Sequence, residues 1–460
     1  MKKVVVIGGG ITGLSTLFYL EKMLENRSLS FELTLVEKEN VLGGKIRTKK
    51  RGEFIIETGA DSMVARHESV QRLVAELNLE KDAVYNATGI SYIYTNNELH
   101  PIPQETVFGI PINEEALNNC TLLSEEGKKR VLQEPEIQSD SFTLESSIGE
   151  FLTYFLGEEI VKKQIGPVLS GVYSGSLDEL TLATTMPYLL EYKKKYGSII
   201  KGLRENREMF LSSANKKFMS FRNGLSAIID ELASQLKQTS ILKGIEAKSI
   251  AKNGAKYDIY FSDGRKIAAD YIVLTTPHQV SQSILNHDEL HPLFNKLTNS
   301  SLFSIYLGYD LNDQVLPKDG TGYITSNNCD VHCNACTWTS RKWKHTSANG
   351  NFLTRLFYKS SNPIYKEMEK MTEDELVKIA MSDIEKSLQI TARPKVVEIT
   401  KWEEAMPNYH LEHKKAIDSL EMKMKELYPN VILAGCSYYG VGIGACIENG
   451  KENAKLIIGE

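Results

Sequence analysis

The first 48 residues constrain the fold of this chain more than any other stretch. Four consecutive apolar residues, Val4 to Ile7, are typical of a strand that is buried on both faces. They run directly into the glycine motif G-x-G-x-x-G at residues 8–13. An apolar segment of helical length follows at 14–24, and a second strand pattern at 31–36 ends on Glu37. This order of strand, helix and strand predicts a Rossmann-like unit that binds a dinucleotide.

Each glycine of the motif has a distinct role that a residue with a side chain could not fill. Gly8 permits the tight turn, Gly10 allows the backbone to approach a pyrophosphate, and Gly13 allows the helix to pack closely on the strand. The helix N-terminus presents unpaired N–H groups to the anion. Glu37 follows Gly13 by 24 residues, close to the roughly 20 of this fingerprint, so we expect it to bind the ribose hydroxyls. With the acid in register, an ordinary glycine-rich turn is the weaker explanation.

The residues that follow this unit indicate which dinucleotide it binds. A glycine pair and a lysine at 43–45 predict a second approach of the backbone to the same ligand. Glu37 followed by G-G-x-x-R-T at 43–48 and by E-T-G-A-D-S at 57–62 resembles the superfamily of FAD-dependent amine oxidases, carotenoid desaturases and protoporphyrinogen oxidases. This resemblance implies that the cofactor is FAD.

The C-terminal stretch carries a second glycine-rich turn. A strand pattern at 431–435 leads into G-V-G-I-G at 440–444, and a helix pattern then runs through Gly450 and Ala454. We expect the N-terminus of this helix to face an anionic or electron-rich group. In the superfamily this helix points at the isoalloxazine ring. The resemblance therefore implies a discontinuous cofactor domain that is closed by both chain ends.

The middle of the chain predicts two further regions. A hairpin pattern at 91–100 is followed by several prolines, which mark a domain boundary, and residues 114–202 are largely helical in pattern. Residues 301–400 mix strands with a helix near 373–388, which is typical of a domain with an antiparallel sheet.

The expected fold class is α/β, with a discontinuous Rossmann-like FAD-binding domain, an α+β substrate-binding domain and an inserted helical domain. A helix over 218–236 and a strand over 270–276 return the chain to the FAD-binding domain. The expected boundaries are 1–69, 216–290 and 420–460 for the FAD-binding domain, 70–103, 203–215 and 291–419 for the substrate-binding domain, and 104–202 for the helical domain.

Composition and charge exclude several classes of protein. The chain has 460 residues, of which 42% are hydrophobic, and a net charge of −5, so it lacks the basic footprint of a nucleic-acid-binding protein. No stretch reaches 18 consecutive apolar residues, so we expect no transmembrane helix. Three glycines interrupt the apolar start, which argues against a signal peptide. We therefore expect a cytoplasmic protein with at most peripheral membrane contact.

Two clusters of reactive residue types need an explanation. Cys329, His332, Cys333 and Cys336 resemble a metal cluster in their spacing. Residues 336–339 predict a strand, however, and alternation would point Cys333 and Cys336 to opposite faces. We therefore expect reduced structural cysteines and no metal site.

The second cluster is the densest run of bases in the chain, at 192–207. It predicts a solvated helix face, with contacts to substrate carboxylates or anionic lipid headgroups as the alternative.

Short motifs along nearly the whole chain narrow the resemblance. Besides the two glycine-rich turns, they are Asn86 to Gly89, Leu99 to Pro103, Leu169 to Gly175, Cys336 to Trp338 and Met406 to His410. Together they resemble the Gram-positive bacterial family of protoporphyrinogen and coproporphyrinogen oxidases. The resemblance implies that FAD and O2 convert coproporphyrinogen III to coproporphyrin III, with release of hydrogen peroxide, in haem biosynthesis. It leaves open the oxidation of protoporphyrinogen IX and a contact with the ferrochelatase of the pathway.

The same resemblance assigns site residues by position. The cofactor contacts are Gly8, Gly9, Gly10, Ile11, Thr12, Gly13 and Leu14 at the pyrophosphate, Glu37 and Lys38 at the ribose, Gly44, Lys45, Gly59, Ala60, Asp61 and Ser62 along the flavin or its linker, Ala247 at adenine, and Trp402, Val441, Gly442 and Ile443 beside the isoalloxazine ring. Arg66 is the expected partner of a substrate carboxylate, and beside it His67 stands where relatives often carry lysine. Cys436 lies at a strand end rather than upstream, so we expect FAD to be bound noncovalently.

Two other interpretations stay open from sequence alone. One is an amine oxidase or carotenoid desaturase of the same fold. The other is a flavoprotein without enzymatic activity that binds or delivers porphyrin. His410 and His413 offer a proton relay in principle, but without a partner acid we expect them to make structural hydrogen bonds.

Overall fold

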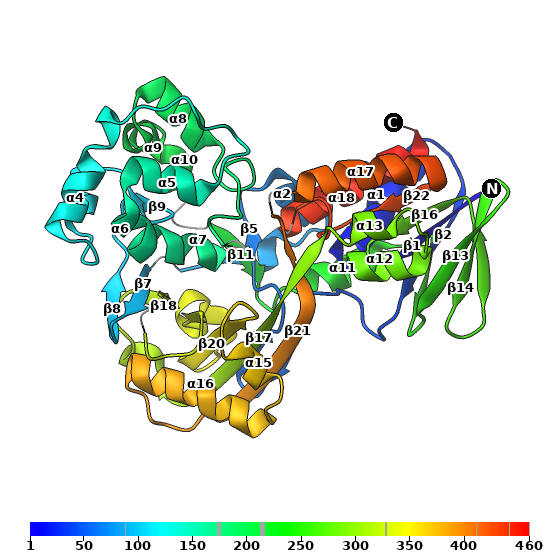
Figure 1. Cartoon of the computed structure of the whole chain (residues 1–460). Helices are drawn as coiled ribbons and strands as arrows, with labels where there is room; N and C mark the ends of the chain where they lie inside the picture. Colours follow the sequence, from blue (N-terminus) through cyan, green and yellow to red (C-terminus); the bar gives the residue numbers. More distant parts are fainter. Residues whose placement is uncertain are drawn as a thin grey trace.

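The structure is a computed structural model that describes residues 1–87, 89–172, 176–211, 217–326, 329–410, 412–440 and 442–459. Figure 1 shows three regions: a layered α/β region that carries both chain termini, a helical region, and a region built on a large sheet. No helix among the described residues is both long and apolar enough to cross a membrane.

The first region is built on a five-stranded parallel sheet in the order β12-β2-β1-β16-β22. Strand β1 pairs on both sides, with β2 and with β16, and Val4, Val5 and Val6 are completely buried. The predicted strand at the start of the chain is therefore confirmed. The strands are β1 (Lys2–Ile7), β2 (Phe31–Glu37), β12 (Thr239–Lys243), β16 (Tyr271–Leu274) and β22 (Val431–Leu433).

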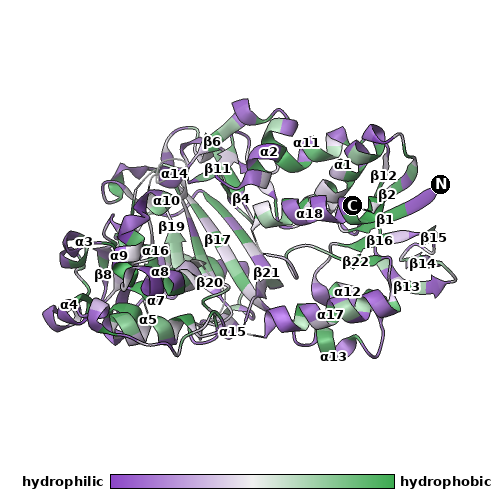
Figure 2. Ribbon diagram, turned by 90° about the horizontal axis from the view of Figure 1, so that it is seen from above, coloured by the Kyte–Doolittle hydropathy of each residue, from purple (hydrophilic) through white to green (hydrophobic). Residues whose placement is uncertain are grey.

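Helices cover both faces of this sheet, as Figure 2 shows. One face shares a core with α1 (Ile11–Asn26), α2 (Glu68–Glu76), α11 (Ala227–Gln235) and α18 (Ile443–Ile458). The other face packs against α12 (His278–Leu285), α13 (His291–Phe294), α17 (His413–Leu427) and a small antiparallel sheet of β13 (Ala247–Asn253), β14 (Lys256–Phe261) and β15 (Lys266–Ala269). The predicted Rossmann-like domain, closed by both chain ends, is thus confirmed.

One predicted element of this region is wrong in part. The helix expected over 218–236 begins only at Ala227, because β11 (Phe218–Phe221) is a strand. It pairs with β5 (Met63–Val64) and β6 (Ala83–Tyr85). A short apolar run fits either a strand or a buried helix, and here pairing with two partners decides for the strand.

The second region is built on a seven-stranded sheet in the order β21-β17-β20-β19-β18-β7-β8, in which only the β18–β7 pair is parallel. The predicted hairpin at 91–100 is confirmed, with Asn96 and Asn97 at positive φ in its turn. The predicted helix near 373–388 is confirmed as α16 (Glu373–Leu388), which packs on the sheet through Leu376, Ala380 and Ile384. The strands are β7 (Ile90–Thr95), β8 (Glu98–Pro101), β17 (Thr298–Asn312), β18 (Gly320–Thr325), β19 (Ala335–Thr337), β20 (Asn351–Lys359) and β21 (Val396–Asn408).

The third region confirms the helical pattern of 114–202 and has its own hydrophobic core. Between α6 and α7 the chain forms a π-helix, Val161–Ile165, a rare element that is frequent at functional sites. The helices are α3 (Glu114–Asn118), α4 (Glu125–Leu132), α5 (Ile148–Leu156), α6 (Glu158–Ile160), α7 (Gly166–Val172), α8 (Tyr188–Tyr196), α9 (Ile199–Glu205) and α10 (Arg207–Leu211).

The predicted solvated face of the basic run contains an exception. Lys193 is only 6% exposed, and its ammonium donates to the carboxylate of Glu134, which is completely buried, at 2.9 Å. The same carboxylate accepts hydrogen bonds from the Ser198 hydroxyl and the Ile199 N–H. Lys193 is therefore a buried structural residue that connects α8 to the start of α9.

The expectation that Cys333 and Cys336 point to opposite faces is wrong. Strand β19 begins only at Ala335, so Cys333 precedes it and alternation does not apply. Both thiols are buried in the same core, where Cys333 lies 3.6 Å from the hydroxyl of Tyr323. Burial raises the pKa of Cys336 to about 12, which keeps it a thiol. Within the described part of the chain, no group of three or more His, Cys, Asp or Glu is placed to hold a metal ion.

The domain boundaries given above stay a proposal, with one refinement. Helix α2 packs on α18, and Val70, Leu73, Val74 and Leu79 belong to the core of the first region. We therefore propose that residues 70–79 belong to the cofactor-binding domain.

Candidate cofactor and substrate site

The first glycine turn joins β1 to α1, and at Gly8 and Gly13 the surrounding protein leaves no space for a side chain. Gly8 has φ +113°, and a Cβ on Gly13 would lie 2.1 Å from the Gly8 carbonyl oxygen. Only glycine fits at these two positions, since one needs a left-handed backbone and the other direct backbone contact. Gly10 is different, because a Cβ there would meet no atom within 4 Å. The turn therefore fits a group that approaches Gly10 closely.

The second glycine pair lies directly against the first turn. The Gly43 N–H donates to the Gly9 carbonyl at 2.8 Å, and Gly10 and Gly43 form a parallel bridge. Gly43 and Gly44 have φ of +112° and +58°, so the reversal of the chain here requires residues without a side chain. Two segments that are some 30 residues apart thus build one glycine-lined surface at the N-terminus of α1.

Glu37 is positioned at the end of β2 as the sequence predicts. The residue is 8% exposed, and its carboxylate accepts hydrogen bonds from the backbone N–H groups of Gly9, at 2.7 Å, and Glu39, at 2.9 Å. The loop after β12 runs beside it, because the Ile245 N–H donates to the Glu37 carbonyl. This loop leads to Ala247, so the residues assigned to ribose and adenine come together at one edge of the sheet.

The second glycine turn presents the N-terminus of α18. Gly442 is the N-cap of this helix, and a Cβ there would again meet nothing within 4 Å. The turn before it is held by Tyr409, whose hydroxyl donates to the Cys436 carbonyl at 2.8 Å and accepts from the Gly440 N–H at 2.5 Å. Val441, which the resemblance assigns to the isoalloxazine ring, lies outside the described residues.

Two side chains of the large sheet hold the predicted flavin-contact segment, residues 57–62, by hydrogen bonds. Trp402 donates its indole N–H to the Thr58 carbonyl at 2.8 Å. Arg355, which is 4% exposed, donates to the carbonyls of Thr58, at 3.3 Å, and Gly59, at 2.9 Å. Trp402 therefore lies beside the segment that the sequence assigned to the same ligand. Sequence reasoning missed Arg355, although a charged residue inside the apolar run 352–358 was a usable signal.

The remaining assigned residues are spread around this segment. Lys45 donates to the Ala405 carbonyl and lies 3.4 Å from the Cys436 sulfur, so it connects the second glycine pair to the turn before α18. Asp61 pairs with Lys342 at 3.5 Å and accepts a hydrogen bond from Ser62. Although burial opposes it, the positive charges of Lys342 and Arg355 hold the pKa of Asp61 below its ordinary value. Lys38 is exposed beside Glu39.

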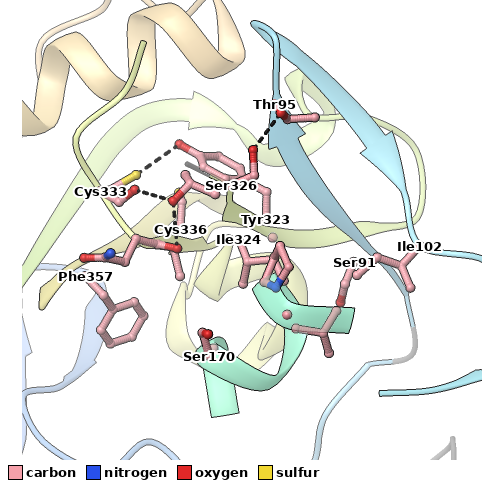
Figure 3. A pocket seen from close by; sticks show the side chains of 18 of the residues that line it. Ser91, Thr95, Ile102, Ser170, Tyr323, Ile324, Ser326, Cys333, Cys336 and Phe357 are labelled. Carbon is pink, nitrogen blue, oxygen red and sulfur yellow. Dashed lines mark hydrogen bonds between the residues drawn. The ribbon is translucent and has the colours of Figure 1, made fainter. Parts of the chain in front are cut away.

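A cavity of about 2370 Å³ adjoins this segment at Asp61. It lies between the large sheet and the helical region. Figure 3 shows Tyr323, Ile324 and Phe357 of the sheet and Ser170 of α7 around the same space. None of the glycines of the two turns line it, but Asp61 does, so the cavity borders the predicted cofactor site at this residue. The predicted small-residue motif contributes Ser170 and Gly171, whereas its residues 173–175 lie outside the described part of the chain.

Arg66 and His67 are not among the described residues that line this cavity. Arg66 is exposed and donates to the Met209 carbonyl at 2.7 Å. The His67 ring packs against Gly444, in the first turn of α18, and lies 2.9 Å from the Ser69 hydroxyl. Their roles at a substrate carboxylate stay predictions. The basic side chains that do line the cavity and that the sequence did not single out are Lys162, Lys163, Lys217, Lys342 and Lys359.

The two histidines near residue 410 are placed differently. His410 hydrogen-bonds through Nε2 to the Lys296 carbonyl at 2.8 Å, which confirms a structural bond. For His413 the expectation is wrong, because neither ring nitrogen has a hydrogen-bond partner among the described residues. Its ring instead stacks on Tyr409, with ring centroids 4.0 Å apart, and so supports the residue that holds the turn before α18.

Acid is expected to destabilise the protein through His413. Burial lowers the pKa of His413 to about 4, whereas a histidine in the unfolded chain has a pKa of about 6.5. Because the unfolded chain binds more protons, the stability is fully present above pH ~6.5 and is lost as the pH falls toward ~4. Between pH ~6.5 and ~5 we expect a loss of about 2 kcal/mol in urea unfolding, and a smaller loss in His413→Phe, which keeps the stack. Equal losses in both proteins would contradict this assignment.

Comparisons with known proteins agree with this geometry. The family described as flavin containing amine oxidoreductase matches residues 11–458. The chain is 34% identical to the coproporphyrinogen III oxidase of Bacillus subtilis (strain 168), covering 98% of this chain and 96% of that protein. It is 30% identical to the Staphylococcus aureus (strain NCTC 8325 / PS 47) protein of the same name, covering 100% and 99%.

Solved structures show the same fold. A crystal structure of a candidate protoporphyrinogen oxidase from Exiguobacterium sp. 255-15 is similar, with a TM-score of 0.90 at 30% identity, over 99% of this chain and 98% of that one. A putrescine oxidase matches with a TM-score of 0.70 at 12% identity, over 100% of this chain and 99% of that one, and at this identity it shares the fold alone.

Proposed function

This chain belongs to the family of flavin-containing amine oxidoreductases, and on that premise we propose that it is an oxygen-dependent oxidase of coproporphyrinogen III. The product is coproporphyrin III, O2 is the electron acceptor and hydrogen peroxide is released. The step belongs to haem biosynthesis. Two relatives at 30% identity or more, aligned over almost their whole length, carry this name.

The observation that carries the proposal is the cavity at Asp61. Its volume of about 2370 Å³ exceeds the ~300–1,000 Å³ of ordinary ligand pockets, so a macrocycle with four pyrroles fits. Gly171 and Ser170 on the helical side leave room for a broad, flat ring. The walls carry five lysines and five carboxylate residues, and the lysines that form no ion pair with a described residue, Lys217 and Lys359, suit a substrate that carries carboxylates.

The glycine surfaces fit FAD, the cofactor of this class of oxidases. Gly8 to Leu14 would hold the pyrophosphate, because Gly10 leaves open space beside the N-terminus of α1. Glu37 would hold the ribose, and Gly44 would lie along the flavin or its linker. When bound, FAD supplies a hydride acceptor for the substrate carbon. The N-terminus of α18, open at Gly442, would stabilise negative charge on the ring. Trp402 and Arg355 hold the segment at 58–59 in place.

Turnover by the purified protein tests the proposal. With FAD bound, anaerobically prepared coproporphyrinogen III is expected to become a fluorescent porphyrin when air is admitted, with one hydrogen peroxide for each pair of electrons removed. Turnover of an amine without porphyrin fluorescence would favour an amine oxidase of the same fold. Porphyrin binding without turnover of either substrate would favour a carrier.

Three finer points belong to the proposal, of which the first and the third rest on the family resemblance and the second on the sequence pattern. Arg66 is proposed to bind a substrate carboxylate from the edge of the site. The enzyme is proposed to work in the cytoplasm. It is proposed to pass its product to the ferrochelatase of the pathway.

A further inference from the structure

The lysines of the cavity are of two kinds. Most have a carboxylate partner: Lys162 pairs with Glu158, Lys163 with Glu159 and Lys342 with Asp61. Lys217 and Lys359 line the same cavity, and neither forms an ion pair with any described residue. Lys217 is exposed and Lys359 is half-buried, so neither ammonium is sealed from solvent. Because no carboxylate of the described residues competes for them, these two are the positions where an incoming carboxylate gains most.

Lys217 belongs to a group of positive charges. Its ammonium and that of Lys342 both lie 5.5 Å from the centre of the Phe218 ring. Burial, with the neighbouring charges of Arg66 and Lys342, lowers the pKa of Lys217. Lys217 and Lys342 thus meet on the cavity wall, where Asp61 pairs with Lys342. Arg66 adds positive charge from outside the cavity, so this corner is net positive and suits the carboxylates of a ligand.

Lys359 stands apart from that group. It is the last residue of β20, and its ammonium donates to the Ser170 carbonyl of α7, so it reaches across the cavity from the sheet to the helical region. This bond uses one of the three N–H donors of the ammonium. Burial lowers the pKa of Lys359, and no other charged group contributes to that shift. The cavity therefore holds a second, separate point of uncompensated positive charge.

We propose that Lys359 determines specificity, by binding a carboxylate that a tetracarboxylate porphyrinogen has and a dicarboxylate one lacks. This inference rests on the proposed function. Coproporphyrinogen III carries one propionate on each pyrrole ring, whereas protoporphyrinogen IX carries propionates on two adjacent rings. The group at Lys217 and Lys342 takes the adjacent pair, which both substrates have. Lys359 meets a propionate on a different ring, where protoporphyrinogen IX carries a vinyl group.

Lys359→Met tests this in the FAD-bound enzyme. We expect kcat/KM for coproporphyrinogen III to fall on the order of 10- to 100-fold, mainly through KM, because a charge-assisted hydrogen bond is lost. For protoporphyrinogen IX we expect a change of less than about 3-fold, since it has no carboxylate at this place. Dissociation constants for coproporphyrin III and protoporphyrin IX, from fluorescence titration, are expected to show the same difference.

Three further variants separate the charge from structural effects. Lys359→Gln retains a donor for the Ser170 carbonyl without the charge and should behave like Lys359→Met. Lys359→Arg retains the charge and should therefore keep the wild-type preference for coproporphyrinogen III over protoporphyrinogen IX. Lys401→Met removes a lysine from β21 of the same sheet, where it pairs with Glu369 outside the cavity, and should leave the substrate preference unchanged.

The outcomes distinguish this inference from the proposed function. If the wild-type enzyme oxidises coproporphyrinogen III but Lys359→Met affects both substrates equally or neither, Lys359 does not determine specificity and the proposed function stands. If Lys359→Gln keeps the wild-type preference for coproporphyrinogen III over protoporphyrinogen IX, the charge of Lys359 does not determine specificity and its role is the hydrogen bond to Ser170. If the wild-type enzyme oxidises neither porphyrinogen, the proposed function itself fails.

Discussion

Gly10→Val is expected to yield a folded protein that retains no FAD. Gly10 is the N-cap of α1 with φ −77°, a conformation that any residue adopts, and a Cβ there would meet no protein atom within 4 Å. The valine side chain would therefore fill the space that a pyrophosphate needs, without disturbing the protein around it. The visible flavin absorbance of the purified protein, relative to its protein absorbance, measures the loss, and circular dichroism measures the fold.

Two variants sharpen this prediction. Gly10→Ala adds a smaller side chain at the same place and should weaken FAD binding without abolishing it. Gly13→Ala, in contrast, would place a Cβ 2.1 Å from the Gly8 carbonyl oxygen and should disturb the packing of α1 on β1 even without FAD. A Gly10→Val protein that holds FAD at wild-type stoichiometry would show that the cofactor does not approach this turn.

Lys193→Met is expected to destabilise the helical region by about 3–5 kcal/mol, because it leaves a buried carboxylate without its counter-ion. Glu134 is completely buried, and Lys193 also donates to the carbonyls of Glu134 and Gly197. Urea unfolding measures the loss, and hydrogen exchange is expected to locate it in α8 and α9, which this pair connects.

The neighbouring residue supplies a matched control. Lys194 is exposed on the same helix, so Lys194→Met should change the stability by no more than about 0.5 kcal/mol. Replacing both members of the pair, in Glu134→Leu with Lys193→Met, should recover part of the loss, since no isolated charge then remains buried. If Lys193→Met is as stable as the wild type, the pair is not the link between the two helices.

Predictions from local pattern succeeded where neighbours in sequence decide the structure. The strands at 4–7 and 31–36 and the two glycine-rich turns follow from apolar runs and from glycines whose spacing a dinucleotide imposes. The partial failure at Phe218–Phe221 has a different cause, because that segment became a strand through pairing with β5 and β6. Neither partner can be read from the segment itself.

The charged residues also show that contacts with distant partners could not be predicted from local pattern. Six neighbouring bases look alike in the run at 192–207, yet Lys193 is buried on Glu134, about 60 positions away in the chain. Arg355 contacts the segment at 58–59 from almost 300 positions away. Such partners depend on how separate elements pack, so they cannot be predicted from the periodicity or the composition of the segment.

By itself, the sequence determined the cofactor half of this protein: a Rossmann-like sheet, a glycine turn for a pyrophosphate and a second turn at the other chain end. This was possible because the glycines of each turn are required by the conformation of the backbone at that place, which depends on residues close in sequence. Only the tertiary structure decided the substrate half. The cavity is formed where the large sheet meets the helical region, and which lysines in it remain without a carboxylate depends on long-range contacts that bring Lys359 to Ser170 and Lys217 to Lys342.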